Sequence, residues 1–251
     1  MTGIPLEIAK IKRRRVLPIT LAVTLSGVAW TAMAIGKMAA KGKIAIDAVT
    51  VLNQYNSVLP MVAPLMVAVL IVRVAGAEQE NDMLTRLVAA GASRTSLWIN
   101  KLLLIAGFLV IIHTIGFAGA IGFGLGSGAT FDAGLTAQCL VLALVTSVEL
   151  AAPLLVIALR GNRQPVVIAI GLALTVAGAL LSLAPVWLQM VLPSTQIYAA
   201  NPTKAVFDAA NYVSGYALNP EGAALIPLVA LIAAAVVAAS AIVHRMWKVE
   251  A

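Results

Sequence analysis

Long apolar stretches divide the chain into six segments that are separated by shorter polar ones. Each stretch reaches the length of about 20 residues that an α-helix needs to cross the hydrocarbon core of a bilayer. We therefore predict six membrane-spanning helices, over residues 16–36, 58–77, 102–124, 135–159, 166–188 and 223–243. These spans leave no room for a soluble domain, so residues 1–251 are expected to form a single domain, an all-α polytopic membrane protein.

Residues 4–15, ahead of the first span, have the pattern of a short amphipathic helix. Three isoleucines fall on one stripe, and basic residues flank it. We expect this helix to lie in the headgroup plane, either as an anchor or as a contact for a partner. The basic segment, the apolar run and an Ala-x-Ala signature at 32–34 also resemble a cleavable signal peptide. The run is longer than the apolar region of such peptides, which favours a retained span.

The connections predict where helices pack and where the chain reaches the surface. Residues 37–57 and 125–134 are expected to be outer loops, and residues 189–222 form the longest outer segment. Its mixture of aromatic and small polar residues predicts interfacial half-helices, with its aromatic residues acting as membrane anchors rather than ligand contacts: Tyr198, Phe207, Tyr212 and Tyr216. The many glycines of the third span predict close helix packing, with a hinge as the alternative.

Composition agrees with a membrane protein, and charge gives its orientation. The chain is 61% hydrophobic and 11% charged, with a mean hydropathy of +1.00, whereas a soluble domain has about 25% charged residues. With both termini in the cytoplasm, the outer side holds only four of the seventeen basic residues: Lys37, Lys41, Lys43 and Lys204. The net charge of +7 thus follows from orientation in a cell (inner) membrane and contact with anionic lipid, without a nucleic-acid partner.

The polar segment at residues 78–101 carries six charges between the second and third spans. About two to eight residues suffice to join two helices, so its length favours a structured element over a solvated loop. Asn81 or Asp82 can cap a helix. Within that helix three residues share one apolar edge: Leu84, Leu87 and Val88.

The second half of this segment predicts a break and a new helix. Gly91 stands where a residue follows a helix C-terminus, and Ser93 can cap a helix that continues into the third span. Trp98 and Lys101 are expected to mark the headgroup level. The pattern therefore predicts a helix, a break and a second helix on the cytoplasmic surface, a place suited to a lever moved by a soluble motor.

Motifs for catalysis or cofactor binding are missing from the sequence. It has no phosphate-binding loop, no H-E-x-x-H and no G-x-S-x-G. Cys139 is the single cysteine, so there is no disulfide framework and no C-x-x-C metal site. We therefore expect no catalytic residue, no metal and no cofactor, and interpret Cys139 as a packing residue.

Two ionisable residues lie inside predicted spans. Glu149 falls near the middle of the fourth span, where a carboxylate costs about 2.5–3.5 kcal/mol on insertion scales. Its side chain must be protonated, paired or in a wet cavity, and Arg73 is the nearest basic residue by depth. Glu149 is therefore either a transport-path residue or a structural hydrogen-bonded group. His113, in the third span, is interpreted as a packing residue, with a place in the same path as the alternative.

Residues 78–101 resemble the cytoplasmic signature of ABC-2 type transporter permeases. The resemblance rests on paired acids, a leucine run, a breaker, a Ser-Arg pair and a following lysine: Glu78, Glu80, Leu84, Leu87, Val88, Gly91, Ser93, Arg94 and Lys101. The family usually has Gly-Thr in place of Asp82-Met83 and Pro in place of Gly91. Six spans with the longest outer loop before the last are also similar, and the length is closest to small permeases of lantibiotic immunity and of bacitracin or multidrug export.

This resemblance implies a coupling helix at about 80–91 that docks on a separate ABC ATPase subunit. It implies two permease subunits, identical or different, and two ATPase subunits per assembly. The expected function is export of an amphipathic peptide, drug or lipid-like substrate by a subunit that is not itself an enzyme. The alternatives are a proton-coupled secondary transporter or channel that uses Glu149 and His113, and a membrane scaffold without transport.

Overall fold

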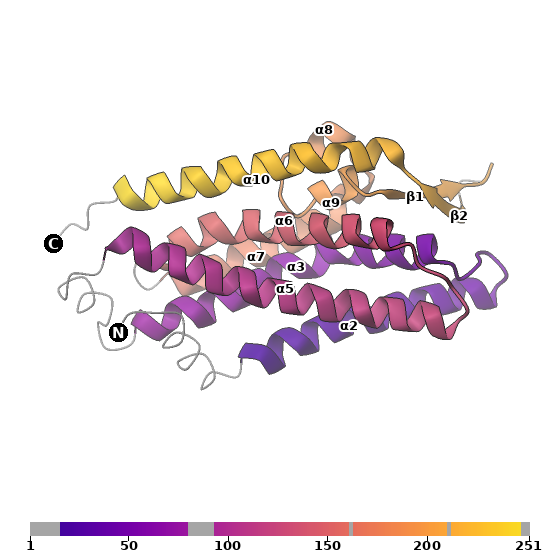
Figure 1. Ribbon diagram of the computed structural model, residues 1–251, viewed down its shortest axis with the longest axis horizontal. Coiled ribbons are helices and arrows are strands. Elements are labelled where there is room, and N and C mark those ends of the chain that lie inside the picture. Colours follow the sequence, from indigo (N-terminus) through magenta and orange to yellow (C-terminus); the bar gives the residue numbers. More distant parts are fainter. Residues whose placement is uncertain (1–15, 80–92, 161–162, 210–211, 247–251) are drawn as a thin grey trace.

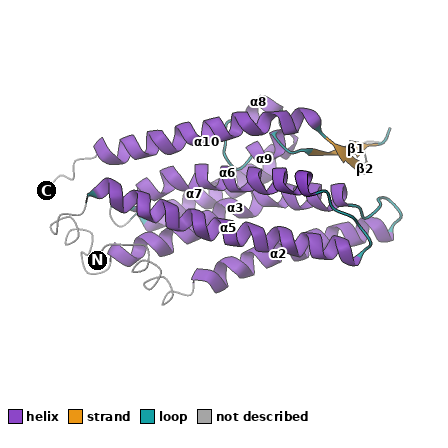
Figure 2. Cartoon of the chain, in the orientation of Figure 1, coloured by secondary structure: helices purple, strands orange, loops and turns teal. Residues whose placement is uncertain are grey.

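Six long helices run side by side, alternating in direction, in the computed structural model, which describes residues 16–79, 93–160, 163–209 and 212–246 (Figure 1). Each is long and apolar enough to cross a membrane. Their bounds are α2 (Val16–Ala40), α3 (Ala48–Gln79), α5 (Arg94–Gly126), α6 (Ala133–Ala158), α7 (Gln164–Leu180) and α10 (Pro220–Met246). The predicted all-α membrane fold with six spans is confirmed, and Figure 2 shows how little of the described chain is strand.

The helix ends differ from the predicted spans most clearly at the start of α3. It begins at Ala48, ten residues before the predicted start at 58, so the first outer loop is shorter than predicted. The carboxylate of Asp47 caps α3 by accepting from the amide of Thr50 at 2.7 Å. Hydropathy misplaced this boundary because the first turns of α3 carry polar residues that are nonetheless buried. The predicted amphipathic helix at 4–15 lies outside the described residues.

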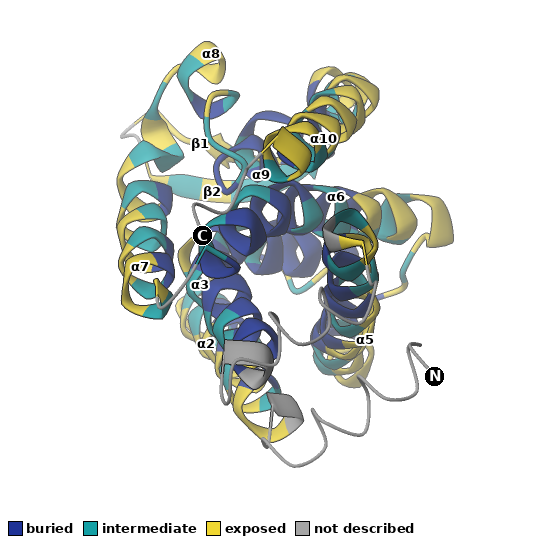
Figure 3. Cartoon of the chain, turned by 90° about the vertical axis from the view of Figure 1, so that its left-hand side faces the viewer, coloured by how far each residue is buried: buried dark blue, intermediate teal, exposed yellow. Residues whose placement is uncertain are grey.

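Two helices occupy the centre of the bundle and the others surround them. Of the 18 most apolar consecutive residues in each helix, 67% are buried in α3 and 61% in α6, whereas 17% are buried in α7 and in α10. Figure 3 shows the buried residues where α3, α5 and α6 meet, and exposed ones on the outward faces of α7 and α10. Outward apolar side chains, such as Leu172 and Leu231, are those a lipid environment accommodates.

The packing of α7 on α3 depends on two prolines facing two glycines. Pro64 has no N–H, so the carbonyl of Pro60, one turn earlier, lacks its usual donor within α3. The backbone of Gly178 packs directly against this carbonyl, and Gly171 packs against Pro64 and Ala68. A glycine lets the backbones approach closely enough for a Cα–H group to contact the freed oxygen. A side chain at Gly178 would separate the helices.

The glycines of the third span pack closely at only some of the predicted positions. Gly116 meets the hydroxyl group of Tyr55, Gly119 meets Val28, and Gly124 meets Phe131. A methyl group would meet no atom within 4 Å at three others: Gly107, Gly122 and Gly126. Close packing is thus confirmed along the face of α5 that is turned toward α2 and α3.

The outer segment before α10 contains strands, which corrects the prediction of half-helices. After a short 3-10 turn (Leu181–Leu183), two single-turn helices, α8 (Val186–Gln189) and α9 (Gln196–Ala199), are followed by strands β1 (Thr203–Phe207) and β2 (Val213–Leu218). The strands pair antiparallel, with a bulge between Val206 and Phe207. Valine and aromatic residues favour strands, and the hairpin lies at the end of the molecule where α10 begins (Figure 1).

Gly178→Ala is expected to destabilise the packing of α7 on α3, because the added methyl group would overlap the carbonyl of Pro60. Overpacking of this kind costs about 1–3 kcal/mol. The midpoint of thermal unfolding, measured in detergent, should fall. Gly107→Ala is the matched control, since its methyl group meets no atom within 4 Å and alanine favours a helix. Equal midpoints for both variants would contradict this account.

Candidate functional site

The predicted coupling segment connects two helices at one end of the bundle, which we call the inner end. There α3 ends at Gln79 and α5 begins at Arg94, so Glu78 and Arg94 stand at the helix ends (Figure 1). The Ser93 hydroxyl accepts from the amide of Ser96 at 3.1 Å, which confirms the predicted cap of α5. The other coupling residues and the predicted helix at 80–91 lie outside the described residues: Glu80, Leu84, Leu87, Val88 and Gly91.

Two buried side chains connect the first turns of α5 to neighbouring helices. The ammonium group of Lys101, 1% exposed, donates to the carbonyl oxygen of Val74 in α3 at 3.3 Å. The indole ring of Trp98, 2% exposed, stacks on the ring of His244 in α10, with centroids 6.2 Å apart. The prediction that both residues mark the headgroup level stays a prediction. Their amphipathic chemistry suited that position, but both side chains point into the bundle.

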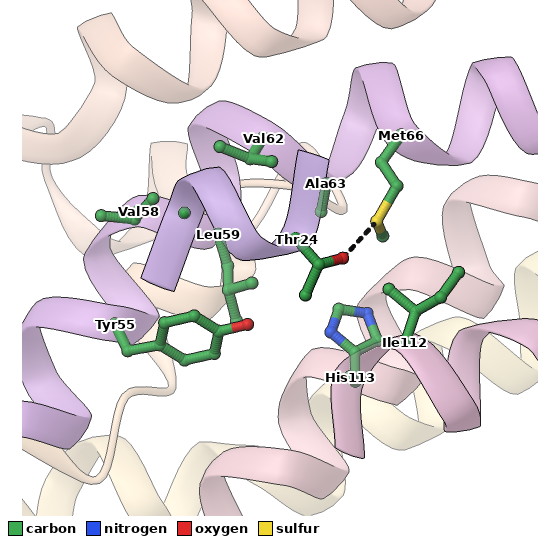
Figure 4. A pocket seen from close by; sticks show the side chains of 10 residues that line it. Thr24, Tyr55, Val58, Leu59, Val62, Ala63, Met66, Ile112 and His113 are labelled. Carbon is green, nitrogen blue, oxygen red and sulfur yellow. Dashed lines mark hydrogen bonds between the residues drawn. The ribbon is translucent and has the colours of Figure 1, made fainter. Parts of the chain in front are cut away.

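A small cavity lies farther from the inner end, between α2, α3 and α5. Figure 4 shows Thr24, Tyr55, Met66 and His113 around it, and its lining is mostly apolar. The ring Nε2 of His113 is 2.9 Å from the hydroxyl of Ser147 in α6, and the side chain is buried. The cavity has room for about one water molecule. It is therefore too small for a peptide or a drug in this conformation.

Glu149 faces the interior and is bonded to the outer segment. The side chain is 2% exposed, and its Oε1 accepts from Nε2 of Gln196 in α9 at 3.2 Å. The same amide nitrogen donates to the carbonyl oxygen of Met190 at 3.3 Å. Arg73, the basic residue nearest by predicted depth, is exposed on α3. The sequence left the partner of Glu149 open, and the structure shows that it is the side-chain amide of Gln196 on the outer segment.

Polar residues in the first turns of α3 hold the outer segment, an arrangement that sequence reasoning missed. The outer polar cluster consists of Asn53, Asn56, Asn201 and Thr203, all buried. Nδ2 of Asn56 donates to Oδ1 of Asn201 at 3.1 Å, and Nδ2 of Asn53 donates to the hydroxyl of Thr203 at 3.1 Å. The available signal was the spacing of polar residues at 53, 54, 56 and 57, which lie on one helical face.

Two tyrosines of the outer segment bond the same part of α3. The hydroxyl of Tyr198 donates to the carbonyl oxygen of Ser57 at 3.1 Å, and that of Tyr216 donates to Oε1 of Gln54 at 3.2 Å. Burial raises the pKa of Tyr198 to about 12. The phenol therefore stays neutral and keeps its donor at physiological pH. These bonds to α3 fix the position of both rings, and the predicted anchoring in the membrane stays a prediction.

Neither His113 nor Glu149 joins a cluster of ionisable groups in the described part of the chain. His113 bonds Ser147, and Glu149 bonds Gln196. Among the described residues, no group of three or more His, Cys, Asp or Glu side chains could hold a metal ion. The structure thus brings the two predicted path residues to separate partners.

Comparison with known proteins relates the chain to a family. A family model described as ABC-2 family transporter protein matches residues 4–182. The matched region includes the first five long helices and the polar segment 78–101, and it ends before α8, the hairpin and α10. No curated protein and no solved structure matches the chain significantly.

Asn201→Ala is expected to destabilise the protein, because it removes the acceptor for Asn56 and Thr203 and leaves their buried donors unpaired. The cost of such a change is about 1–3 kcal/mol. Thermal unfolding in detergent measures it. Gln138→Ala, at an exposed position of α6, is the control and should leave the midpoint unchanged. An unchanged midpoint for Asn201→Ala would show that the cluster contributes nothing to stability.

Proposed function

The chain belongs to the ABC-2 family of transporter proteins, and from this premise we propose that it is the permease subunit of an ABC exporter. A separate ATPase subunit binds and hydrolyses ATP, and a coupling helix at about residues 80–91 docks on it. The motion of that helix re-packs the spans and moves the substrate. The permease itself contributes no catalytic group.

The observation that carries this proposal is the construction of the inner end. The segment proposed to couple begins where α3 ends and ends where α5 begins. Lys101 bonds α5 to α3 about two turns into α5, and Trp98 packs α5 against α10. A displacement of the segment that moves α5 therefore reaches three spans through the buried side chains of Lys101 and Trp98.

The distribution of basic residues supports a cytoplasmic inner end. Five basic residues belong to helix ends or turns there: Arg94, Lys101, Arg160, Arg163 and Arg245. The first residue of α2 and the last of α10 lie at the same end (Figure 1). By the positive-inside rule, this end faces the cytoplasm. Both termini are then cytoplasmic, and an ATPase subunit in that compartment can reach the coupling segment.

The chemistry of the interior favours an amphipathic peptide, drug or lipid-like molecule as the substrate. The described spans offer mostly apolar side chains with few polar groups, among them His113, bonded to Ser147, and Glu149, bonded to Gln196. A sugar would leave many hydroxyl groups unpaired in such surroundings. Since the small cavity near His113 holds no substrate of this size, the path forms when the spans re-pack or where a second permease subunit, identical or different, packs against this one.

The purified chain alone is expected to show no ATP hydrolysis, because it has no phosphate-binding loop. Co-expression with its ABC ATPase should give a complex that survives purification and hydrolyses ATP. Phosphate release and size-exclusion chromatography measure the two results. Hydrolysis by the chain alone would contradict the proposal. Substrate movement driven by a proton gradient without any ATPase would instead favour a secondary transporter.

Glu80→Lys, and the pair Leu84→Asp with Leu87→Asp, are expected to uncouple transport from ATP hydrolysis. An unpaired charge placed at a docking surface costs about 2–5 kcal/mol, so ATP-driven transport in vesicles should fall at least about tenfold. Membrane insertion should stay normal, because the segment is outside the predicted spans.

Lys204→Glu, which reverses an exposed charge on β1 at the opposite end, is the matched control and should keep normal transport. If the Glu80→Lys variant and the variant with Leu84→Asp and Leu87→Asp both transport normally, the ATPase does not act through residues 80–91.

A further inference from the structure

The contact between Glu149 and Gln196 leaves two buried oxygen atoms unexplained. One hydrogen bond joins the pair, from Nε2 of Gln196 to Oε1 of Glu149 at 3.2 Å. The other oxygen of each group, Oε2 of Glu149 and Oε1 of Gln196, is buried and has no hydrogen-bond partner within the described residues. Both atoms are acceptors when Glu149 is ionised. Two buried acceptors without a donor are costly, and a charged one in a span is more so.

The orientation of the Gln196 amide is fixed by a third group. Its nitrogen donates to the carbonyl oxygen of Met190 as well as to Glu149. A backbone carbonyl can only accept. Turning the amide over would place its oxygen against that carbonyl and against the carboxyl, so the unpaired atom of Gln196 must be its oxygen. Oε1 of Gln196 therefore needs a hydrogen-bond donor beside it.

We propose that Glu149 and Gln196 form a proton-binding site in which the glutamic acid is neutral. Its O–H, on Oε2, donates to Oε1 of Gln196, while the amide nitrogen donates to Oε1 of Glu149. The result is a cyclic acid–amide pair. One proton satisfies both unexplained atoms and removes the charge from the span. With Met190 accepting the other N–H, every polar atom of the amide is bonded, as a buried polar network requires.

The site fastens the outer segment to the centre of the bundle. Gln196 opens α9, and α9 leads directly into Asn201 and the outer polar cluster. The segment is thus held to α6 by the proton-binding site and to α3 by the cluster. In this conformation Glu149 presents no negative charge to a cationic substrate. Its role is to position α9, which is a role outside the transport function proposed above.

Infrared spectroscopy tests the protonation directly. The full chain, purified at neutral pH in a detergent without ester groups, should show the carbonyl stretch of a protonated carboxylic acid, and Glu149→Gln should abolish it. Asp132→Asn is the matched control, because Asp132 is an exposed carboxyl that caps the same helix, and its change should leave the band in place. A spectrum without the band, or a band that survives in Glu149→Gln, would overturn the proposal.

Thermal unfolding of the same preparations tests the pairing. Glu149→Gln replaces the acid by an amide that can form the same two hydrogen bonds, so its midpoint should stay within about 2 °C of the parent. Glu149→Leu leaves one N–H and the oxygen of the Gln196 amide unpaired and should lower the midpoint by about 5 °C or more. Adding Gln196→Leu to Glu149→Leu should restore part of that loss.

If Glu149→Gln and Glu149→Leu lower the unfolding midpoint by the same amount, Glu149 and Gln196 do not form the proposed acid–amide pair. Neither measurement uses ATP, substrate or a partner. Failure of the proton-binding site would therefore leave the proposed export function standing, and failure of export would leave the site standing.

Discussion

Water is absent from the hydrocarbon core of a bilayer, so every polar group that a chain carries into it must be bonded within the protein. This requirement explains most of the specific contacts in the structure. His113 meets Ser147, Glu149 meets Gln196, and the asparagines of α3 meet Asn201 and Thr203. Close packing selects some neighbours, as where the glycines of α7 meet the prolines of α3. The polar contacts fix others, and the height at which they meet.

Helix α3 satisfies this requirement differently along its length. Its outer turns use amide side chains to hold the segment before α10. In its middle, Pro64 frees the carbonyl of Pro60, which the backbone of Gly178 in α7 covers. Near its inner end, the carbonyl of Val74 accepts from Lys101 of α5. One central helix therefore connects the outer segment, the lipid-facing α7 and the helix that follows the coupling segment.

The spans could be predicted because a run of apolar residues depends only on local sequence. The start of α3 could not, since Asn53 and Asn56 read as loop residues until their partners, about 150 positions away, are known. For the same reason Glu149 could be singled out while Gln196 could not. Trp98 and Lys101 could be placed at the start of the third span, but not their turn into the bundle, because composition does not say which way a helix is turned. The hairpin was missed because its strands are short.

The contacts along α3 also bear on how movement at one end reaches the other. Side chains bonded to backbone carbonyls and to amides resist sliding more than apolar contacts do, because each bond is lost if the helices shift along one another. Lys101 makes such a bond at the inner end, and the outer polar cluster makes several at the outer end of the same helix. A shift of α5 that pulls α3 would thus move the outer segment with it. Since Gln196 holds that segment to α6 as well, α3, α6 and α9 are expected to move as one body, while α7 and α10, less buried, re-pack around them.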